Sequence, residues 1–342
     1  MSDQTLSTAY PSETDFPSAK PIAEQLRFAL NYAILAPSSH NSQPWHFMIQ
    51  DNFALVCADR TRALAVVDPY DRELTISCGA ALLNLRVALS YFGLPYAITP
   101  FPYSAESDVL AQIQVCADGF IDPELKKLFH AIPKRKTNRN SFAHSPVPAE
   151  LQKQMGEAAA AEGVTLTCID AEDQRKAIAG LVSEADHKQF ADPQFRRELA
   201  SWIHSSRRND GLPVYAYGIS SILNNATPLV NAVVRTFDIG NNIAASHLQL
   251  AEGSPLLACI STAPDNAQTW LAVGQALERV LLVVAEAGFD ASYLNQPIEV
   301  PALRSRLHLL AGGEPSPQIL LRIGKAATTL ASPRRPLGDV LW

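Results

Sequence analysis

Two short segments hold the residues best suited to bind a polar ligand. The first, residues 36–45, has the sequence APSSHNSQPW, in which hydroxyl, imidazole and amide side chains lie between two prolines. A loop restrained in this way can present hydrogen-bonding groups with little further loss of entropy. The alternative is a polar turn whose side chains cap the neighbouring backbone. The spacing leaves both interpretations open.

The second segment is basic and reads KRKTNR over residues 134–139. Arg135, Thr137 and Arg139 alternate along it, so an extended chain would place their side chains on one side. Two guanidinium groups and a hydroxyl group can surround a phosphate. The alternative is a solvated basic loop, which composition alone favours.

The sequence lacks the usual catalytic and metal-binding patterns. It has no GxGxxG, GxxxxGK[ST], HExxH or GxSxG motif, and its histidines are never paired at the spacing of metal ligands on a helix. Asp186 and His187 are neighbours and must point to different faces of a helix, so we expect both to be solvated surface residues. We therefore predict no metal site and name no catalytic residue.

Composition limits the class of protein. The 342 residues are 47% hydrophobic and 18% charged, with a formal net charge of −6. This balance is typical of a folded globular chain, and it does not favour a nucleic-acid partner. The five cysteines are scattered and never spaced as CxxC, which is typical of a reducing compartment. Residues 1–20 have the polar composition of a flexible tail, and the longest later apolar run is too short to span a bilayer, so we expect a cytoplasmic protein without a membrane partner.

Helical and strand patterns alternate along the rest of the chain. The expected helices are 21–35, 74–92, 122–132, 149–161, 172–190, a helix ending near 252, 268–287 and 301–310. The expected strands are 46–50, 53–58, 96–101, 109–116, 164–169, 256–261 and 318–323. Residues 192–237 follow neither period, and we interpret them as an irregular insertion.

An internal repeat links two of the predicted helices. The motif GxAL begins at Gly79 and again at Gly274, and each helix ends at a glycine, Gly93 or Gly288, with the same spacing. Two buried helices could resemble one another by chance. The alternative is a duplicated domain that packs its paired helices together, as a symmetric dimer does.

The two polar segments resemble the motifs of one family. The run APSSHNSQPWHF is similar to the signature of the FMN-dependent nitroreductases, and Arg135-x-Thr137-x-Arg139-x-x-Phe142 resembles that family's phosphate-binding opening, with threonine in place of the usual serine. The end of the chain, through Arg334 and Arg335, also resembles the family's C-terminal run. The motif order differs from that of an ordinary nitroreductase, because here the basic opening follows the polar loop. This order resembles the Acg-like branch, in which one chain holds two unequal halves.

The resemblance implies an α+β, nitroreductase-like fold in which two fused halves form a pseudo-dimer. The expected parts are a flexible polar tail (1–20), a first half (21–131) and a second half (132–342) that contains the insertion 192–237. Only one complete site can be assembled from these motifs. The chain could therefore work as a monomer, although a homodimer stays open.

The resemblance also implies FMN as cofactor. The phosphate would bind the basic segment and the C-terminal arginines, the polar loop would reach the isoalloxazine and ribityl groups, and residues 291–293 would lie near the reactive edge of the flavin. The implied FMN-binding residues are Pro37, Ser38, Ser39, Asn41, Arg135, Thr137, Arg139, Ala291, Ser292, Tyr293, Arg334 and Arg335.

Two functions follow from this resemblance. The first is an FMN-dependent oxidoreductase that transfers hydride from NAD(P)H to a small acceptor such as a nitroaromatic or a quinone. The second is an Acg-like protein that stores or sequesters FMN under a lid and has little reductase activity. The candidate lid is the insertion, with Trp202, Arg207, Arg208 and Asp210.

Overall fold

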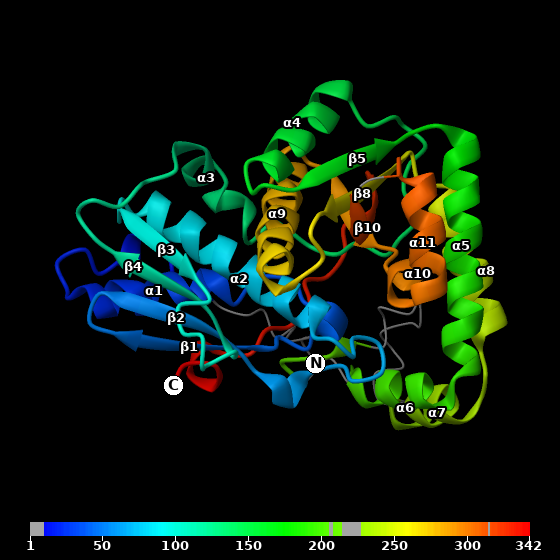
Figure 1. The fold of residues 1–342 in the computed structure, drawn as a ribbon, viewed down its shortest axis with the longest axis horizontal. Helices are drawn as coiled ribbons and strands as arrows, with labels where there is room; N and C mark the ends of the chain where they lie inside the picture. The colour runs from blue at the N-terminus through cyan, green and yellow to red at the C-terminus, as the bar shows by residue number, and fades with distance from the viewer. Residues whose placement is uncertain (1–9, 205–207, 214–226, 314) are drawn as a thin grey trace, which may run out of the picture.

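The computed structural model describes residues 10–204, 208–213, 227–313 and 315–342. Two four-stranded antiparallel sheets, one from each half of the chain, lie on either side of two long helices, α2 and α9 (Figure 1). The strand order is β1-β2-β4-β3 in the first sheet and β5-β8-β10-β9 in the second. This arrangement confirms the predicted α+β chain of two fused halves.

The first half contains a hairpin, a long core helix and a second pair of strands. Its helices and strands are α1 (Ile22–Ala33), β1 (Trp45–Gln50), β2 (Phe53–Ala58), α2 (Arg72–Tyr91), β3 (Tyr96–Pro100), β4 (Val109–Val115) and α3 (Pro123–Lys127).

The second half has more helices, and two of them lie in the insertion. Its helices and strands are α4 (Ala149–Ala160), β5 (Thr165–Ile169), α5 (Glu172–Ala191), α6 (Pro193–Trp202), β6 (Ile203–His204), β7 (Leu212–Pro213), α7 (Thr227–Thr236), α8 (Gly240–Glu252), β8 (Leu256–Thr262), α9 (Ala267–Glu286), β9 (Asp290–Tyr293), α10 (Gln296–Glu299), α11 (Pro301–Leu310) and β10 (Ser316–Gly324). All the helices and strands expected from the sequence are present, and the structure adds β9 and α10 outside the insertion and α6, α7, β6 and β7 within it.

The two halves meet where the repeated helices cross. A methyl group on Gly274 of α9 would overlap the carbonyl oxygen of Ile76, and one on Gly79 of α2 would overlap that of Leu271. The helices can approach this closely only because neither has a side chain at the crossing point. The repeat therefore marks the interface between the halves, as predicted.

Helix α2 is the buried core of the first half. It is the one helix of the described residues that is long and apolar enough to cross a membrane, but 89% of the apolar stretch is buried inside the protein. Leu82, Leu83 and Leu85 on this helix are fully buried against α1 and the first sheet. The apolar character of α2 is therefore explained by packing within the protein.

The C-terminal tail returns to the first half. The backbone N–H of Phe47 in β1 donates to Val340 at 2.7 Å, and that of Trp342 donates to Phe47 at 2.9 Å. Figure 1 shows the C-terminus beside β1. The tail was expected to belong to the second half with the rest of residues 132–342, whereas its end extends the first sheet and buries Val340 in that sheet's core.

Two expectations about irregular segments are wrong. Residues 10–20 are not a flexible tail, because Phe16 stacks on Phe92 with ring centroids 4.0 Å apart and the Tyr32 hydroxyl donates to Pro11. The insertion is not irregular in its described parts, because α6 and α7 occupy much of it. Residues 1–9 and Arg207 lie outside the described residues.

Candidate functional site

A cavity of about 490 Å³ is lined by residues of both halves. This volume lies within the range of ~300–1,000 Å³ that is usual for small-molecule sites. The apolar part of the lining comes from both halves and from the insertion, and consists of Ile76, Phe190, Phe195, Leu199, Leu212, Ile243, Leu250, Leu277, Leu294 and Ile319.

Nine of the twelve predicted site residues line this cavity: Pro37, Ser38, Ser39, Asn41, Thr137, Arg139, Ser292, Tyr293 and Arg334. The polar loop, the basic segment, strand β9 and the C-terminal tail therefore meet there, although they are far apart in the sequence. Arg135, Ala291 and Arg335 are not part of the lining.

The polar loop is held in an uncommon backbone conformation. His40, Asn41 and Gln43 all have φ near +50°, a left-handed region that non-glycine residues rarely adopt. Ser38 stabilises the turn, because its hydroxyl oxygen accepts the Gln43 N–H at 2.9 Å. Backbone of this kind persists only where the surrounding structure holds it, and such positions cluster at functional sites.

Two polar side chains of the loop bind protein groups. The Asn41 amide donates to the carbonyls of Gly211 and Pro333, each at 3.1 Å, and its oxygen accepts from Arg334 at 3.0 Å. The Ser39 hydroxyl donates to Glu73. Asn41 therefore joins the loop to the insertion and to the tail, in addition to lining the cavity.

His40, in the middle of the loop, also lines the cavity. Burial, followed by the charge of Arg139, lowers the pKa of His40 to about 4. The imidazole is therefore neutral at pH 7 and adds no charge to the site.

The basic segment runs alongside β9. The Asn138 N–H donates to the Ala291 carbonyl at 2.9 Å, and the Asn138 amide donates to Ala327 at 2.8 Å. Asn138 therefore points away from the cavity, while Thr137 and Arg139 line it. The alternation expected from the sequence holds for these two residues.

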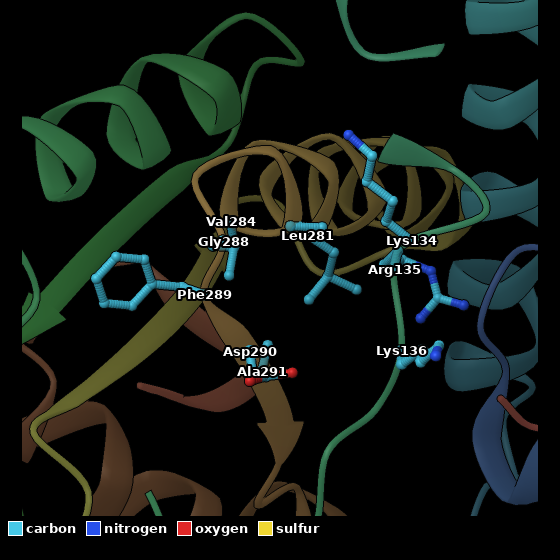
Figure 2. Close-up of a pocket in the computed structure, with 10 residues that line it drawn as sticks. Lys134, Arg135, Lys136, Leu281, Val284, Gly288, Phe289, Asp290 and Ala291 are labelled. Carbon is cyan, nitrogen blue, oxygen red and sulfur yellow. The ribbon is translucent and has the colours of Figure 1, made fainter. Parts of the chain in front are cut away.

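Arg135 differs from that expectation. Its guanidinium donates to the Leu35 carbonyl at 3.0 Å, and its Nε lies 3.3 Å from the carboxylate of Glu278 in the interface between the halves. Figure 2 shows the Arg135 side chain pointing toward the first half, away from Ala291. Arg334 donates to the same Leu35 carbonyl at 3.1 Å, so Arg135 lies directly behind the cavity wall.

The Glu278 carboxyl group is fully buried in that interface. Burial raises the pKa of Glu278 to about 7, and the nearby Arg135 opposes this shift. Arg135 is held between Leu35 and Glu278 in the interface between the halves, which explains its absence from the lining.

The three residues of β9 divide between two surfaces. Ser292 and Tyr293 line the large cavity, whereas Ala291 lines a small separate pocket of about 190 Å³ with Lys134 and Lys136 (Figure 2). The Tyr293 hydroxyl is buried and has no hydrogen-bond partner among the residues that the structure describes. Burial raises the pKa of Tyr293 well above its usual value, so the hydroxyl group stays protonated. It can therefore donate a hydrogen bond to a ligand.

The two C-terminal arginines point in different directions. Arg334 lines the cavity, whereas Arg335 donates to the carbonyls of Gln43 and Asp339 and lies 3.6 Å from Asp59. We expected both to face the ligand, but consecutive residues of an extended tail point to opposite sides.

The sequence analysis missed a third arginine of the lining. Arg322 in β10 is 1% exposed and also lines the cavity. We call Arg139, Arg322 and Arg334 the cationic lining. The sequence did contain one indication of Arg322: it is the charged residue within the otherwise apolar run 319–323. Charged side chains rarely occupy such buried positions unless they are paired.

Three carboxylates that no sequence motif indicated also line the cavity: Glu73, Asp186 and Glu299, which we call the acidic lining. Asp186 was expected to be a solvated surface residue, but it is 1% exposed and accepts from His247 at 2.9 Å. Glu299 accepts from Gln189 at 2.6 Å. Burial, followed by the negative charge of Glu73, raises the pKa of Glu299.

Comparison with known proteins gives the family. No protein-family model matches the chain. The "Putative NAD(P)H nitroreductase Rv3131" of Mycobacterium tuberculosis is 31% identical over 327 residues, covering 94% of this chain and 92% of that protein. The "Putative NAD(P)H nitroreductase acg" of the same organism is 27% identical over 328 residues, covering 95% of this chain and 97% of that protein.

A solved structure is similar to part of the chain. The FMN-dependent nitroreductase NfnB from Mycobacterium smegmatis, in complex with NADPH, aligns with a TM-score of 0.41 and 16% identity, covering 63% of this chain and 97% of that one. The assignment rests on the longer and more similar match to Rv3131. The chain belongs to the nitroreductase family, in the branch that contains Acg and Rv3131.

Proposed function

We propose that the chain binds one FMN in the large cavity and acts as an NAD(P)H oxidoreductase that reduces a small acceptor such as a nitroaromatic or a quinone. The main support is the meeting of the polar loop, the basic segment and the C-terminal tail on one cavity. The names of the curated relatives, NAD(P)H nitroreductases, support the same donor.

The chemistry of the lining fits FMN. A flavin phosphate needs cationic donors, and Arg139 and Arg334 supply guanidinium groups beside the hydroxyl of Thr137. The buried Tyr293 hydroxyl has no partner in the described part of the chain, so a polar ligand group would satisfy it. Apolar side chains such as Leu277 and Ile319 can pack on a ring system.

The flavin, when bound, supplies the hydride-transfer chemistry. The residues of the chain bind it, orient it and exclude water from it, so no side chain needs to act as an acid or a base. We therefore assign no catalytic residue.

Flavin content tests this proposal directly. The purified protein should show the absorption spectrum of a bound flavin, and acid should release FMN at a molar ratio of one per chain. A ratio near two would reveal a second site, and no flavin binding after incubation with FMN would refute the proposal. In anaerobic stopped-flow experiments, NADH or NADPH should bleach the flavin within seconds.

Storage of FMN under a lid is the second candidate, and contacts of the insertion favour it. The N–H of Gly211 donates to the Asn41 carbonyl at 3.1 Å, and Gln43 donates to Asn209 at 2.8 Å. Arg62 forms an ion pair of 2.5 Å with Asp210. The insertion is thus joined to the polar loop itself, and a closed loop over a site can limit exchange of donor and acceptor.

A second contact joins α6 to the first half. The Glu198 carboxylate accepts the backbone N–H groups of Val66 and Val67 at 2.8 and 3.0 Å. The double variant Asp210→Asn, Glu198→Gln removes one charge at each contact. If the wild-type flavin stays oxidised with both donors and the variant flavin bleaches, storage is the correct function; rapid bleaching of the wild type supports the reductase.

We also propose that the chain is a cytoplasmic monomer, because the interface between α2 and α9 is internal and all five cysteines are free thiols. Size-exclusion chromatography with light scattering would test the monomer. Fractionation of the producing cells would test the location.

A further inference from the structure

Arg322 is a buried cation in the middle of the second sheet. It lies in β10, in register with Leu257 of β8 and Ser292 of β9, and is 1% exposed. Its neighbours in the strand, Leu321 and Ile323, are fully buried apolar residues. A charge in such a position costs several kcal/mol unless it is compensated.

The described partners of Arg322 are neutral. Its two terminal nitrogens donate to the carbonyls of Asn140 and Asn138 at 2.9 and 3.1 Å, and its guanidinium carbon lies 4.2 Å from the ring centroid of Phe142. These contacts fix its orientation, but they leave a full positive charge in the wall of the cavity.

Three other buried arginines, Arg72, Arg135 and Arg279, have carboxylate partners. Arg72 lies 2.8 Å from Glu73, and Arg279 lies 2.9 Å from Glu162. Arg322 forms no ion pair with any carboxylate in the described part of the chain. A ligand is therefore the natural source of the missing negative charge.

Arg139 increases the need for such a charge. The two carbonyls that hold Arg322 belong to the residues on either side of Arg139, and both arginines line the cavity. Burial, followed by the charge of Arg139, lowers the pKa of Arg322 to about 10. Two guanidinium groups that line one cavity are stabilised by an anion between or beside them.

We propose that Arg322 stabilises negative charge on the isoalloxazine ring, and thereby favours the reduced form of the bound flavin. This inference rests on the proposed binding of FMN. Reduction at neutral pH adds two electrons and one proton to the ring, so the ring gains one negative charge. A fixed positive charge beside it raises the reduction potential.

The phosphate is the other negative group of FMN, but the structure favours the ring as the partner of Arg322. Arg322 lies next to Ser292 of β9, whereas Arg334 donates to Leu35 of the first half and to Asn41 of the polar loop. Arg334 therefore provides a separate place for the phosphate.

The test compares Arg322→Gln and Arg322→Lys with the wild type. Arg306→Gln is the matched control, because it removes one positive charge from an exposed site on α11. The reduction potential of the bound flavin is measured by anaerobic titration against a reference dye, and the dissociation constants of oxidised FMN and riboflavin are measured by fluorescence.

We expect Arg322→Gln to lower the equilibrium constant for flavin reduction about tenfold, which is about 30 mV for a two-electron couple. Arg322→Lys, which keeps the charge, should stay near the wild type, as should Arg306→Gln. If Arg322→Gln does not fold, Arg322→Lys is used for the test instead. Lysine keeps the charge but lacks the guanidinium fork that binds a phosphate. If Arg322→Lys loses affinity for FMN but keeps its affinity for riboflavin, the proposal is overturned.

Two further results would overturn it. The first is a reduction potential of the flavin bound to Arg322→Gln that equals the wild-type value. The second is that Arg322→Gln binds FMN more weakly but riboflavin as tightly as the wild type does, which would assign Arg322 to the phosphate. Both require wild-type protein that binds flavin, so they leave the proposed function intact. A wild type that binds no flavin would instead refute the proposed function, and this inference with it.

Discussion

The cationic and acidic linings of the cavity are held by different kinds of partner. Arg322 and Arg334 donate to neutral oxygen atoms: the backbone carbonyls of Asn138 and Asn140 in one case, and the Leu35 carbonyl and the Asn41 amide oxygen in the other. Each carboxylate of the acidic lining, in contrast, has at least one side-chain donor: Arg72 and Ser39 for Glu73, His247 for Asp186, and Gln189 for Glu299.

This difference indicates different roles for the two linings. A cation held by neutral carbonyls keeps its charge available to a ligand, so the cationic lining is suited to hold the anionic part of one. Carboxylates that already have donors gain less from a ligand, and they repel a second negative group. The acidic lining is therefore suited to select among ligands by charge, while the cationic lining anchors them.

The largest expected effect comes from separating the two halves of the chain, because both halves line the cavity. In Gly274→Ala, the new methyl group would overlap the carbonyl oxygen of Ile76, and the backbone there cannot move without shifting α2. We expect a loss of about 3 kcal/mol in the free energy of unfolding, at the upper end for an overpacked site, and loss of flavin binding. Urea unfolding measures the first and flavin retention the second.

Gly156→Ala in α4 is the matched control. Nothing lies within 4 Å of a methyl group placed there, so the better helix propensity of alanine should stabilise the protein by ~0.5–1 kcal/mol. Equal stabilisation by the two substitutions would mean that the helices do not touch at Gly274.

Acid pH should destabilise the side of the cavity that contains His40. The pKa of this group falls from 6.5 to about 4 on folding, so the unfolded chain binds more protons between these values. The contribution of His40 is complete above pH 6.5 and is lost as the pH falls toward 4, by at most about 3 kcal/mol. His40→Asn removes the titration, and asparagine tolerates the left-handed backbone of this position.

Urea unfolding of both proteins at pH 7, 5.5 and 4 measures this contribution, because titrations common to both cancel. The wild type should lose more stability than His40→Asn on acidification. Parallel curves would show that His40 is not kept neutral by burial.

Much of the polar lining of the cavity could be predicted because many of its residues lie in contiguous motifs. Pro37–Asn41 and Thr137–Arg139 keep their neighbours whatever the fold, so a local pattern was sufficient. The pattern could not reveal that Arg135 is withdrawn, because its partner Glu278 lies more than a hundred residues away in α9.

The acidic lining has no such local signature. Its members come from α2, α5 and α10 and meet only after the two halves have packed. A weaker signal was present in α5, where Asp186 lies on the same helical face as the buried residues Ile178, Val182 and Gln189. The pairing with His247 of α8 depends on the packing of two helices, which no spacing encodes.

The two linings should differ in their effect on FMN binding. Arg139→Ala should weaken binding of FMN about tenfold or more, because a charge-assisted hydrogen bond contributes ~1.5–3 kcal/mol. Glu299→Gln should leave the dissociation constant within about twofold of the wild type. Quenching of FMN fluorescence measures both constants, and equal losses in the two variants would contradict the assignment of the phosphate and ring to the cationic lining.

The effect expected from Glu299 appears as the pH rises, opposite in direction to that of His40. Burial and the charge of Glu73 raise the pKa of Glu299 on folding, so the folded chain keeps a proton that the unfolded chain releases. Its contribution is therefore complete at acid pH and is lost as the pH rises through the raised pKa. The hydrogen bond from Gln189 and the charge of Arg72 oppose the shift in pKa but do not cancel it. Glu299→Gln, which can still accept the hydrogen bond from Gln189, should lose less stability between pH 5 and 9 than the wild type. The substitution Glu150→Gln, at an exposed position of α4, should follow the wild type.

If Glu299→Gln also follows the wild type in urea unfolding across this range, Glu299 ionises freely and the acidic lining is more hydrated than its burial implies.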